Sequence, residues 1–170
     1  MFVAVGVLFF VSFIYDSYKK RMRKKLDVGI RYSMLAIASI LIPIVISSVF
    51  IFGFNVEFEL LSRVVVFYGF SILFGFITTL ILGQTYKTLP FIIWLEKYKK
   101  LVGKTKIPLP RELYSEKIAS IQFYLYLSFI IIIPIGILSN SLVLVKVGSI
   151  ILLLVTILYN INVFKIILHK

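Results

Sequence analysis

The chain has 170 residues, of which 61% are hydrophobic and 15% are charged, and it contains no cysteine. So few charges exclude a soluble domain of ordinary composition, and the lack of thiols excludes disulfides, thiolate chemistry and iron–sulfur clusters held by this chain. The net charge of +12 would suggest a nucleic-acid ligand in a soluble protein, but here the basic residues flank apolar runs. They indicate membrane orientation and contact with anionic lipid headgroups, and we expect no nucleic-acid partner.

Five apolar runs predict an all-α polytopic bundle, organised as a single transmembrane domain over residues 1–170. The predicted spans are residues 2–15, 32–54, 64–86, 118–138 and 142–164. The first run should extend only about 21 Å against a hydrocarbon core of about 30 Å, so it is either a short span or the tail of a longer one. It does not resemble a cleaved signal, because no basic segment precedes it and no small-residue cleavage site follows it.

The second and third predicted spans each carry an informative local pattern. Pro43 should kink the second span and free a carbonyl group near Ser39, because proline has no amide hydrogen. The third span has a small residue at every fourth position: Ser71, Gly75, Thr79 and Gly83. These four residues would lie on one helix face and let another helix approach closely, so we expect a partner helix there. Small residues are also common in spans without such a contact.

A basic amphipathic segment follows the third span. Lys87 is the first charge after Arg63, which puts the membrane surface near it. Pro90 should end the span and begin a separate helix over residues 90–102, because proline suits the first turn of a helix but not its interior. The alternation of apolar and basic residues predicts that this helix lies in the headgroup plane, anchored by Pro90, Trp94 and Tyr98.

The basic residues are strongly biased to one side of the predicted bundle. Seven of the 19 Lys and Arg residues lie in the loop after the first span, eight in the loop before the fourth, and two at the C-terminus. Only Arg63 and Lys146 lie on the other side. This bias predicts a multi-pass protein of a bacterial-type inner membrane, with the N-terminus outside and the C-terminus cytoplasmic. Lys146, inside the last span, either snorkels to the outer surface or is a functional cation.

The chain offers little catalytic chemistry. The single histidine, His169, is the second-last residue, where we expect a solvated tail far from other metal ligands. No carboxylate lies inside a predicted span, and the sequence has no phosphate-binding loop or nucleophile motif. We therefore predict no metal site, no catalytic residue and no enzymatic activity by this chain alone. Polar residues do fall in the inner halves of three spans: Gln84, Tyr86, Gln122, Tyr126, Asn160 and Asn162. They could form interhelical hydrogen bonds or line a polar pocket at the inner face.

Two segments, GQTYKTLPFIIWLEKY and the following VGKTKIPLPRELYSEK, resemble a signature in the C-terminal part of larger bacterial membrane proteins. Those proteins are distantly similar to the haem-copper oxidase subunit I superfamily. The preceding KKRMRKKLDVGIRYSMLAIASI resembles the basic loop and span before that signature, so the resemblance extends from about Lys19 to the end of the fourth span. It implies histidines at the positions of Gln84 and Glu96, and neither residue would hold haem iron. Met34 could be an axial ligand only with a histidine from elsewhere.

The resemblance therefore implies either the tail of a split protein or a version that has lost its cofactor. We predict no cofactor, with haem only if a partner supplies ligands. The leading hypothesis is a non-catalytic membrane subunit that packs through the Ser71–Gly83 face, against either a respiratory or redox partner or a second copy. The alternative is a small homo-oligomeric transporter or channel, in which Pro43 and Pro134 break helices at a site. An enzyme acting on lipid ranks behind both, because the chain lacks a candidate base or metal cluster.

Overall fold

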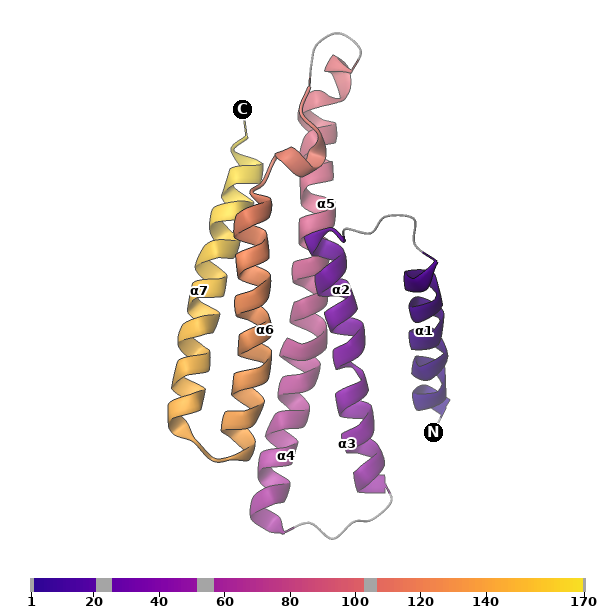
Figure 1. Cartoon of the computed structure of the whole chain (residues 1–170), viewed down its shortest axis with the longest axis vertical. Helices are drawn as coiled ribbons and strands as arrows, with labels where there is room; N and C mark the ends of the chain where they lie inside the picture. Colours follow the sequence, from indigo (N-terminus) through magenta and orange to yellow (C-terminus); the bar gives the residue numbers. More distant parts are fainter. Residues whose placement is uncertain (1, 21–25, 52–56, 103–106, 170) are drawn as a thin grey trace.

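The computed structural model describes residues 2–20, 26–51, 57–102 and 107–169. Within these ranges the chain is helical, and successive long helices run in opposite directions (Figure 1). The helices are α1 (Phe2–Lys19), α2 (Val28–Ser39), α3 (Leu41–Ile51), α4 (Phe58–Phe70), η1 (Ser71–Thr78), α5 (Thr79–Tyr98), η2 (Lys99–Leu101), η3 (Pro110–Glu112), α6 (Glu116–Leu138) and α7 (Leu142–Ile167). The predicted all-α fold is confirmed.

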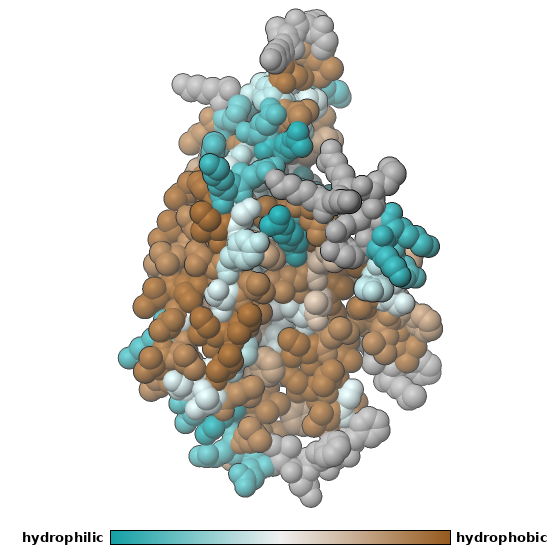
Figure 2. All heavy atoms as spheres, viewed as in Figure 1, coloured by the Kyte–Doolittle hydropathy of each residue, from teal (hydrophilic) through white to brown (hydrophobic). Residues whose placement is uncertain are grey.

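Four helical stretches are long and apolar enough to cross a membrane. They are Val28–Ile51, Phe58–Leu101, Glu116–Leu138 and Leu142–Ile167, and α1 contains the shorter apolar stretch Val5–Ser17. Figure 2 shows a broad hydrophobic band over the middle of the visible face, with hydrophilic side chains gathered toward its two ends. Such a band is the surface that a multi-pass membrane protein presents to lipid.

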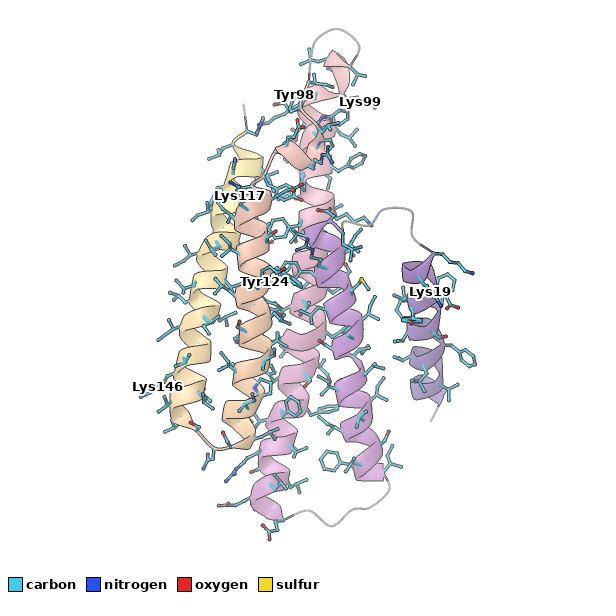
Figure 3. The ribbon with its side chains drawn as sticks, viewed as in Figure 1. Lys19, Tyr98, Lys99, Lys117, Tyr124 and Lys146 are labelled. Carbon is cyan, nitrogen blue, oxygen red and sulfur yellow. The ribbon has the colours of Figure 1, made fainter. Side chains whose placement is uncertain are left out.

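The two ends of the bundle differ in charge. Lys99 and Lys117 lie toward one end, whereas Lys146 points away from α7 near the other end (Figure 3). We call the first of these the basic end; it also carries Lys87 on α5. Lys146 is exposed, as either explanation of this charge requires. At the opposite end Asn140 turns the chain between α6 and α7 with a left-handed φ of 54°, a conformation that asparagine tolerates.

The second predicted span is interrupted at Ile40, between α2 and α3. Pro43 falls in the first turn of α3, where its missing amide hydrogen costs little. The Ser39 hydroxyl donates to the carbonyl of Leu35 at 2.8 Å, so it holds the end of α2. The helix thus breaks at Ile40, three residues before the proline for which a kink was predicted.

The prediction of a separate helix beginning at Pro90 is wrong. Helix α5 runs through Pro90, and the continuous stretch Phe58–Leu101 has 44 residues, or a length of about 66 Å. Since the hydrocarbon core is about 30 Å thick, the turns after Lys87 project beyond it, as Figure 1 shows for the end of α5. Pro90 is buried, and the Trp94 indole donates to the Pro108 carbonyl at 2.7 Å. Packing of the returning segment thus offsets the cost of proline inside a helix, about 3 kcal/mol.

The C-terminus folds onto this projecting part of α5. The Tyr98 hydroxyl and His169 Nδ1 lie 2.9 Å apart, and the Lys97 ammonium donates to the carbonyl of Ile167 at 3.1 Å. A cation at the end of α7 also complements the negative end of its helix dipole. The prediction that His169 lies in an isolated, solvated tail is therefore wrong. Two of the three predicted membrane anchors, Trp94 and Tyr98, contact this chain's own loop and C-terminus.

The small-residue face of the long helix is buried, and its partner is α2 of the same chain. Ser71, Gly75, Thr79 and Gly83 are all buried. A Cβ atom placed on Gly83 would lie 2.9 Å from the Gly29 carbonyl oxygen, so the two backbones are in contact. The packing role predicted for this face is thus observed. At Gly75 and Gly83 the helix that packs on this face is α2, and not one of a separate subunit.

The π-helix η1 helps to keep the four small residues on one side of the long helix, where Gly75 and Gly83 contact α2 and the Thr79 hydroxyl donates to Tyr126 of α6. In an α-helix, residues four apart drift by about 40° at each step, so four of them would spread over about 120°. Between Ser71 and Thr78 the wider π turn rotates residues four apart in the opposite sense, which cancels part of this angular drift. The hydroxyls of Thr78 and Thr79 donate to carbonyls five residues earlier, at 2.8 and 2.7 Å, and so support the wider turn. The sequence pattern alone did not predict this element.

Candidate functional site

The basic end of the bundle contains a cavity of about 480 Å³, within the range of small-molecule sites. It lies between the start of α2, the middle of α5 and η3. Lys87, Arg111 and Asp27 bring charge to its lining, and Pro90 and Phe91 bring apolar surface. Because Lys87 ends the apolar part of the long helix, we expect the cavity at the height of the lipid headgroups.

Helix caps position the cavity's rim. The Asp27 carboxylate caps α2 by accepting a hydrogen bond from the Val28 amide at 2.8 Å. The short helix η3 begins at Pro110, and the Glu112 carboxylate accepts from the Leu109 amide at 2.9 Å, which holds Arg111 between them. Ser115 caps α6 just below. The start of α2 and the loop that carries η3 and Tyr114 therefore meet beside α5, and this juxtaposition creates the cavity.

Two tyrosines form the floor of the cavity. The Tyr114 hydroxyl donates to Asp27 Oδ1 at 3.1 Å, which joins the loop before α6 to α2. Burial, and then the negative charge of Asp27, raise the pKa of Tyr114 well above its ordinary value, so the hydroxyl remains a proton donor at neutral pH. The Tyr86 hydroxyl donates to Gln122 Oε1 and accepts from Asn162 Nδ2, the second of these at 3.3 Å. These contacts connect α5 to α6 and α7.

A polar and aromatic cluster lies beneath the floor. The ring of Tyr32 contacts those of Tyr86 and Tyr126, with its centroid 6.3 Å from that of Tyr86 and 5.7 Å from that of Tyr126. Two buried polar atoms, the Tyr32 hydroxyl and Gln122 Nε2, have no hydrogen-bond partner among the described residues. Either orientation of the Gln122 amide leaves one of its polar atoms unpaired. Such an atom costs about 1–3 kcal/mol when it is buried.

The structure brings together part of the predicted inner-half polar cluster. Tyr86, Gln122 and Asn162 are linked by hydrogen bonds. Tyr126 contacts the same cluster through its ring, but its hydroxyl donates deeper in the bundle, to the Phe74 carbonyl at 2.6 Å. Gln84 is exposed at the outer side of the cavity, where its amide lies 3.4 Å from the Ser33 hydroxyl.

Asn160 does not join this cluster. It is exposed and donates to the Thr156 carbonyl of its own helix at 2.9 Å. Sequence reasoning missed Asp27, Tyr32, Arg111 and Tyr114. Asp27 could have been identified as a helix cap directly before VGIRYS, whereas the position of Tyr114 depends on how the loop returns to the bundle.

The chemistry of the cavity favours binding by charge and hydrogen bonds. Two cations, one carboxylate and tyrosine hydroxyls surround a partly apolar space. In the described parts of the chain, no three histidine, aspartate or glutamate side chains form a group that could hold a metal ion.

The fold and cavity define a class: a multi-pass helical membrane protein with a preformed cavity at its basic end. Comparisons with protein-family models, with curated proteins and with solved structures gave no match. The resemblance to haem-copper oxidase-like proteins gains no support from them. Gln84 and Glu96, which stand where that resemblance implies histidines, are both exposed and lie about 18 Å apart along the helix axis.

Proposed function

We propose that this protein is a ligand-binding membrane protein whose site is the cavity at the basic end. The observation that carries the proposal is the combination of Lys87 and Arg111 with a hydrogen-bonded tyrosine floor at membrane-surface height. Residues of α5, α6 and α7 hold Tyr86 in place, so the floor is formed before any ligand arrives. As part of the proposal, the basic end faces the cytoplasm, because basic side chains gather there.

The packing below the cavity supports binding more than conduction. The rings of Phe70, Phe74 and Phe129 lie 5.2–5.5 Å apart, beneath Tyr126. These rings fill the middle of the bundle, where a continuous pathway for a solute would have to run. The cavity therefore ends inside the protein, which favours a binding protein over the alternative of a channel.

Filling the cavity with a bulky side chain should abolish ligand binding. Thr88 is exposed and lines the cavity, so Thr88→Trp should occupy the space without changing charge or the buried core. We expect native mass spectra of the protein, extracted from its own membrane in mild detergent, to show an additional small-molecule mass that Thr88→Trp loses.

Thr156→Trp is the matched control, because Thr156 is an exposed threonine on α7 that also bonds the carbonyl four residues earlier. It should retain the additional mass. A wild-type protein without any such mass, or a mass equally abundant in Thr88→Trp, would contradict the proposal.

A second candidate function is that of a subunit in a larger membrane assembly, and the position of α1 favours it. Helix α1 stands apart from the other helices in Figure 1. Its apolar side chains Leu8, Phe9, Phe10 and Phe13 are exposed in several directions. A helix that is apolar all round and touches few neighbours can contact another membrane protein or a second copy. The contact would use α1, since α2 covers the small-residue face.

A photo-reactive side chain should distinguish these surfaces. Placed at Phe13 of α1, it should form covalent adducts with another protein in the native membrane, because this helix is expected to lie at the interface. Placed at Ile150 of α7, which is similarly exposed, it should react mainly with lipid. Equal protein adducts at both positions, or none at Phe13, would count against the subunit hypothesis.

A further inference from the structure

We infer that the cavity binds the headgroup of an anionic phospholipid and that an adjoining groove on α5 holds its acyl chain. This inference rests on the proposed function, because it names the ligand class of the same cavity. Its first support is the groove, which has a volume of about 410 Å³. Leu80 and Ile81 line the part of the groove before Lys87, at membrane depth, whereas Leu89 and Ile92 line the part after it.

The cavity and the groove are joined. Gln84 and Thr88 line both, so the two spaces adjoin at these side chains. From the height of Lys87, the groove continues toward Leu80 and Ile81, which lie about 10 Å deeper along the helix. Ile81 is on the lipid-facing side of α5 with 57% of its surface exposed. A polar solute would occupy only the cavity, and an apolar molecule only the groove. The two spaces together therefore suit an amphiphile, which has a polar and an apolar part.

The charges of the cavity select the headgroup. Lys87 and Arg111 come from different chain segments and line the same space. A phosphodiester offers two anionic oxygens, which suit the planar fork of an arginine and the point charge of a lysine. Among the described residues of the lining Asp27 is the single carboxylate, so two cations against one anion give this part a net charge of +1. That balance matches the single negative charge of a phosphodiester lipid.

Asp27 adds a further preference. Its Oδ1 atom already accepts hydrogen bonds from the Val28 amide and the Tyr114 hydroxyl. The carboxylate can accept further hydrogen bonds from hydroxyl groups, since an ionised carboxylate has about four acceptor positions. A headgroup that combines a phosphodiester with hydroxyl donors, such as phosphatidylglycerol, therefore complements the cavity better than a choline headgroup.

Titration of the delipidated full-length protein in detergent tests this inference. We expect native mass spectra to show at least about tenfold tighter binding of phosphatidylglycerol than of phosphatidylcholine. Lys87→Gln/Arg111→Gln should weaken phosphatidylglycerol binding by about tenfold and remove the preference, because the phosphate loses both cations. The control Lys99→Gln/Lys117→Gln removes the same charge from the basic end outside the cavity and should keep the preference. An equal loss in both variants would show general attraction by surface charge and would overturn the inference.

Two further measurements distinguish the possible outcomes. Inorganic phosphate at millimolar concentration should not displace the lipid, whereas effective displacement would show that the cavity takes free phosphate.

The groove is tested by Ile81→Trp, which fills it. This variant should bind the lipid more weakly, and an unchanged affinity would contradict the placement of the lipid's acyl chain in the groove. A ligand whose binding is lost in Thr88→Trp but unchanged in Lys87→Gln/Arg111→Gln would agree with the proposed function and contradict the assignment of an anionic lipid. The absence of any Thr88-dependent ligand would refute both.

Discussion

Gly83→Ala should lower the free energy of unfolding by about 2 kcal/mol, and Gly83→Leu should prevent α2 and α5 from packing. The added Cβ atom would lie 2.9 Å from the Gly29 carbonyl oxygen, 2.9 Å from Tyr32 Cβ and 3.1 Å from the Ser33 amide nitrogen. Two of these atoms are backbone atoms and the third is a Cβ atom, so none can rotate away. The steric clash can be relieved only if α2 moves. Unfolding in mixed detergent micelles, followed by circular dichroism, measures the effect.

The chain supplies its own graded controls for this prediction. An added Cβ atom on Gly75 would meet Ser39 Cβ at 3.3 Å and should cost less, whereas Gly69 has no atom within 4 Å. Gly69→Ala should be neutral or stabilising, because alanine favours the helix by up to about 1 kcal/mol. Gly29→Ala/Gly83→Ala should cost less than the sum of the two single changes, since one separation of α2 from α5 relieves both contacts. Equal effects at Gly69 and Gly83 would contradict the close packing of α2 on α5.

Tyr86→Phe should lower the free energy of unfolding by about 1–3 kcal/mol, and Gln122→Leu should lower it clearly less. The Tyr86 hydroxyl donates to Gln122 and accepts from Asn162, so its removal leaves both amides without this partner in a buried environment. Gln122→Leu leaves the Tyr86 hydroxyl without its acceptor, but it also removes an amide with an unpaired buried atom and substitutes an apolar side chain of similar size. Because these two effects oppose each other, Gln122→Leu should be the smaller loss.

A double-mutant cycle measures this coupling. In the Gln122→Leu background, Tyr86→Phe should cost clearly less than it does alone, because the amide that needed the hydroxyl is gone. Tyr124→Phe is the matched control on the exposed side of α6, where 60% of the tyrosine surface is accessible, and it should change stability little. If Tyr86→Phe were no more costly than Tyr124→Phe, the hydrogen-bonded floor of the cavity would not contribute to stability.

The class of protein and the main helical segments could be predicted from the pattern of apolar residues alone. In lipid, a run of about 20 apolar residues is expected to form a helix, because a helix pairs the backbone amide and carbonyl groups by hydrogen bonds within the segment. The same local reasoning identified an interruption near Pro43 and the packing role of Ser71, Gly75, Thr79 and Gly83. These features depend on residue spacing and on the backbone chemistry of proline and glycine, which do not depend on the tertiary structure.

The contacts that these segments make could not be predicted in the same way. A row of small residues permits close approach but does not specify which helix arrives, and here α2 fills the face predicted for another subunit. Pro90 is unfavourable in an isolated helix, yet burial of Pro90 and the bond from Trp94 to the Pro108 carbonyl keep α5 continuous. The cavity depends on Asp27, Lys87 and Arg111 meeting from separate segments. Such convergence is set by the packing energy of the whole bundle, which no local pattern of residues records.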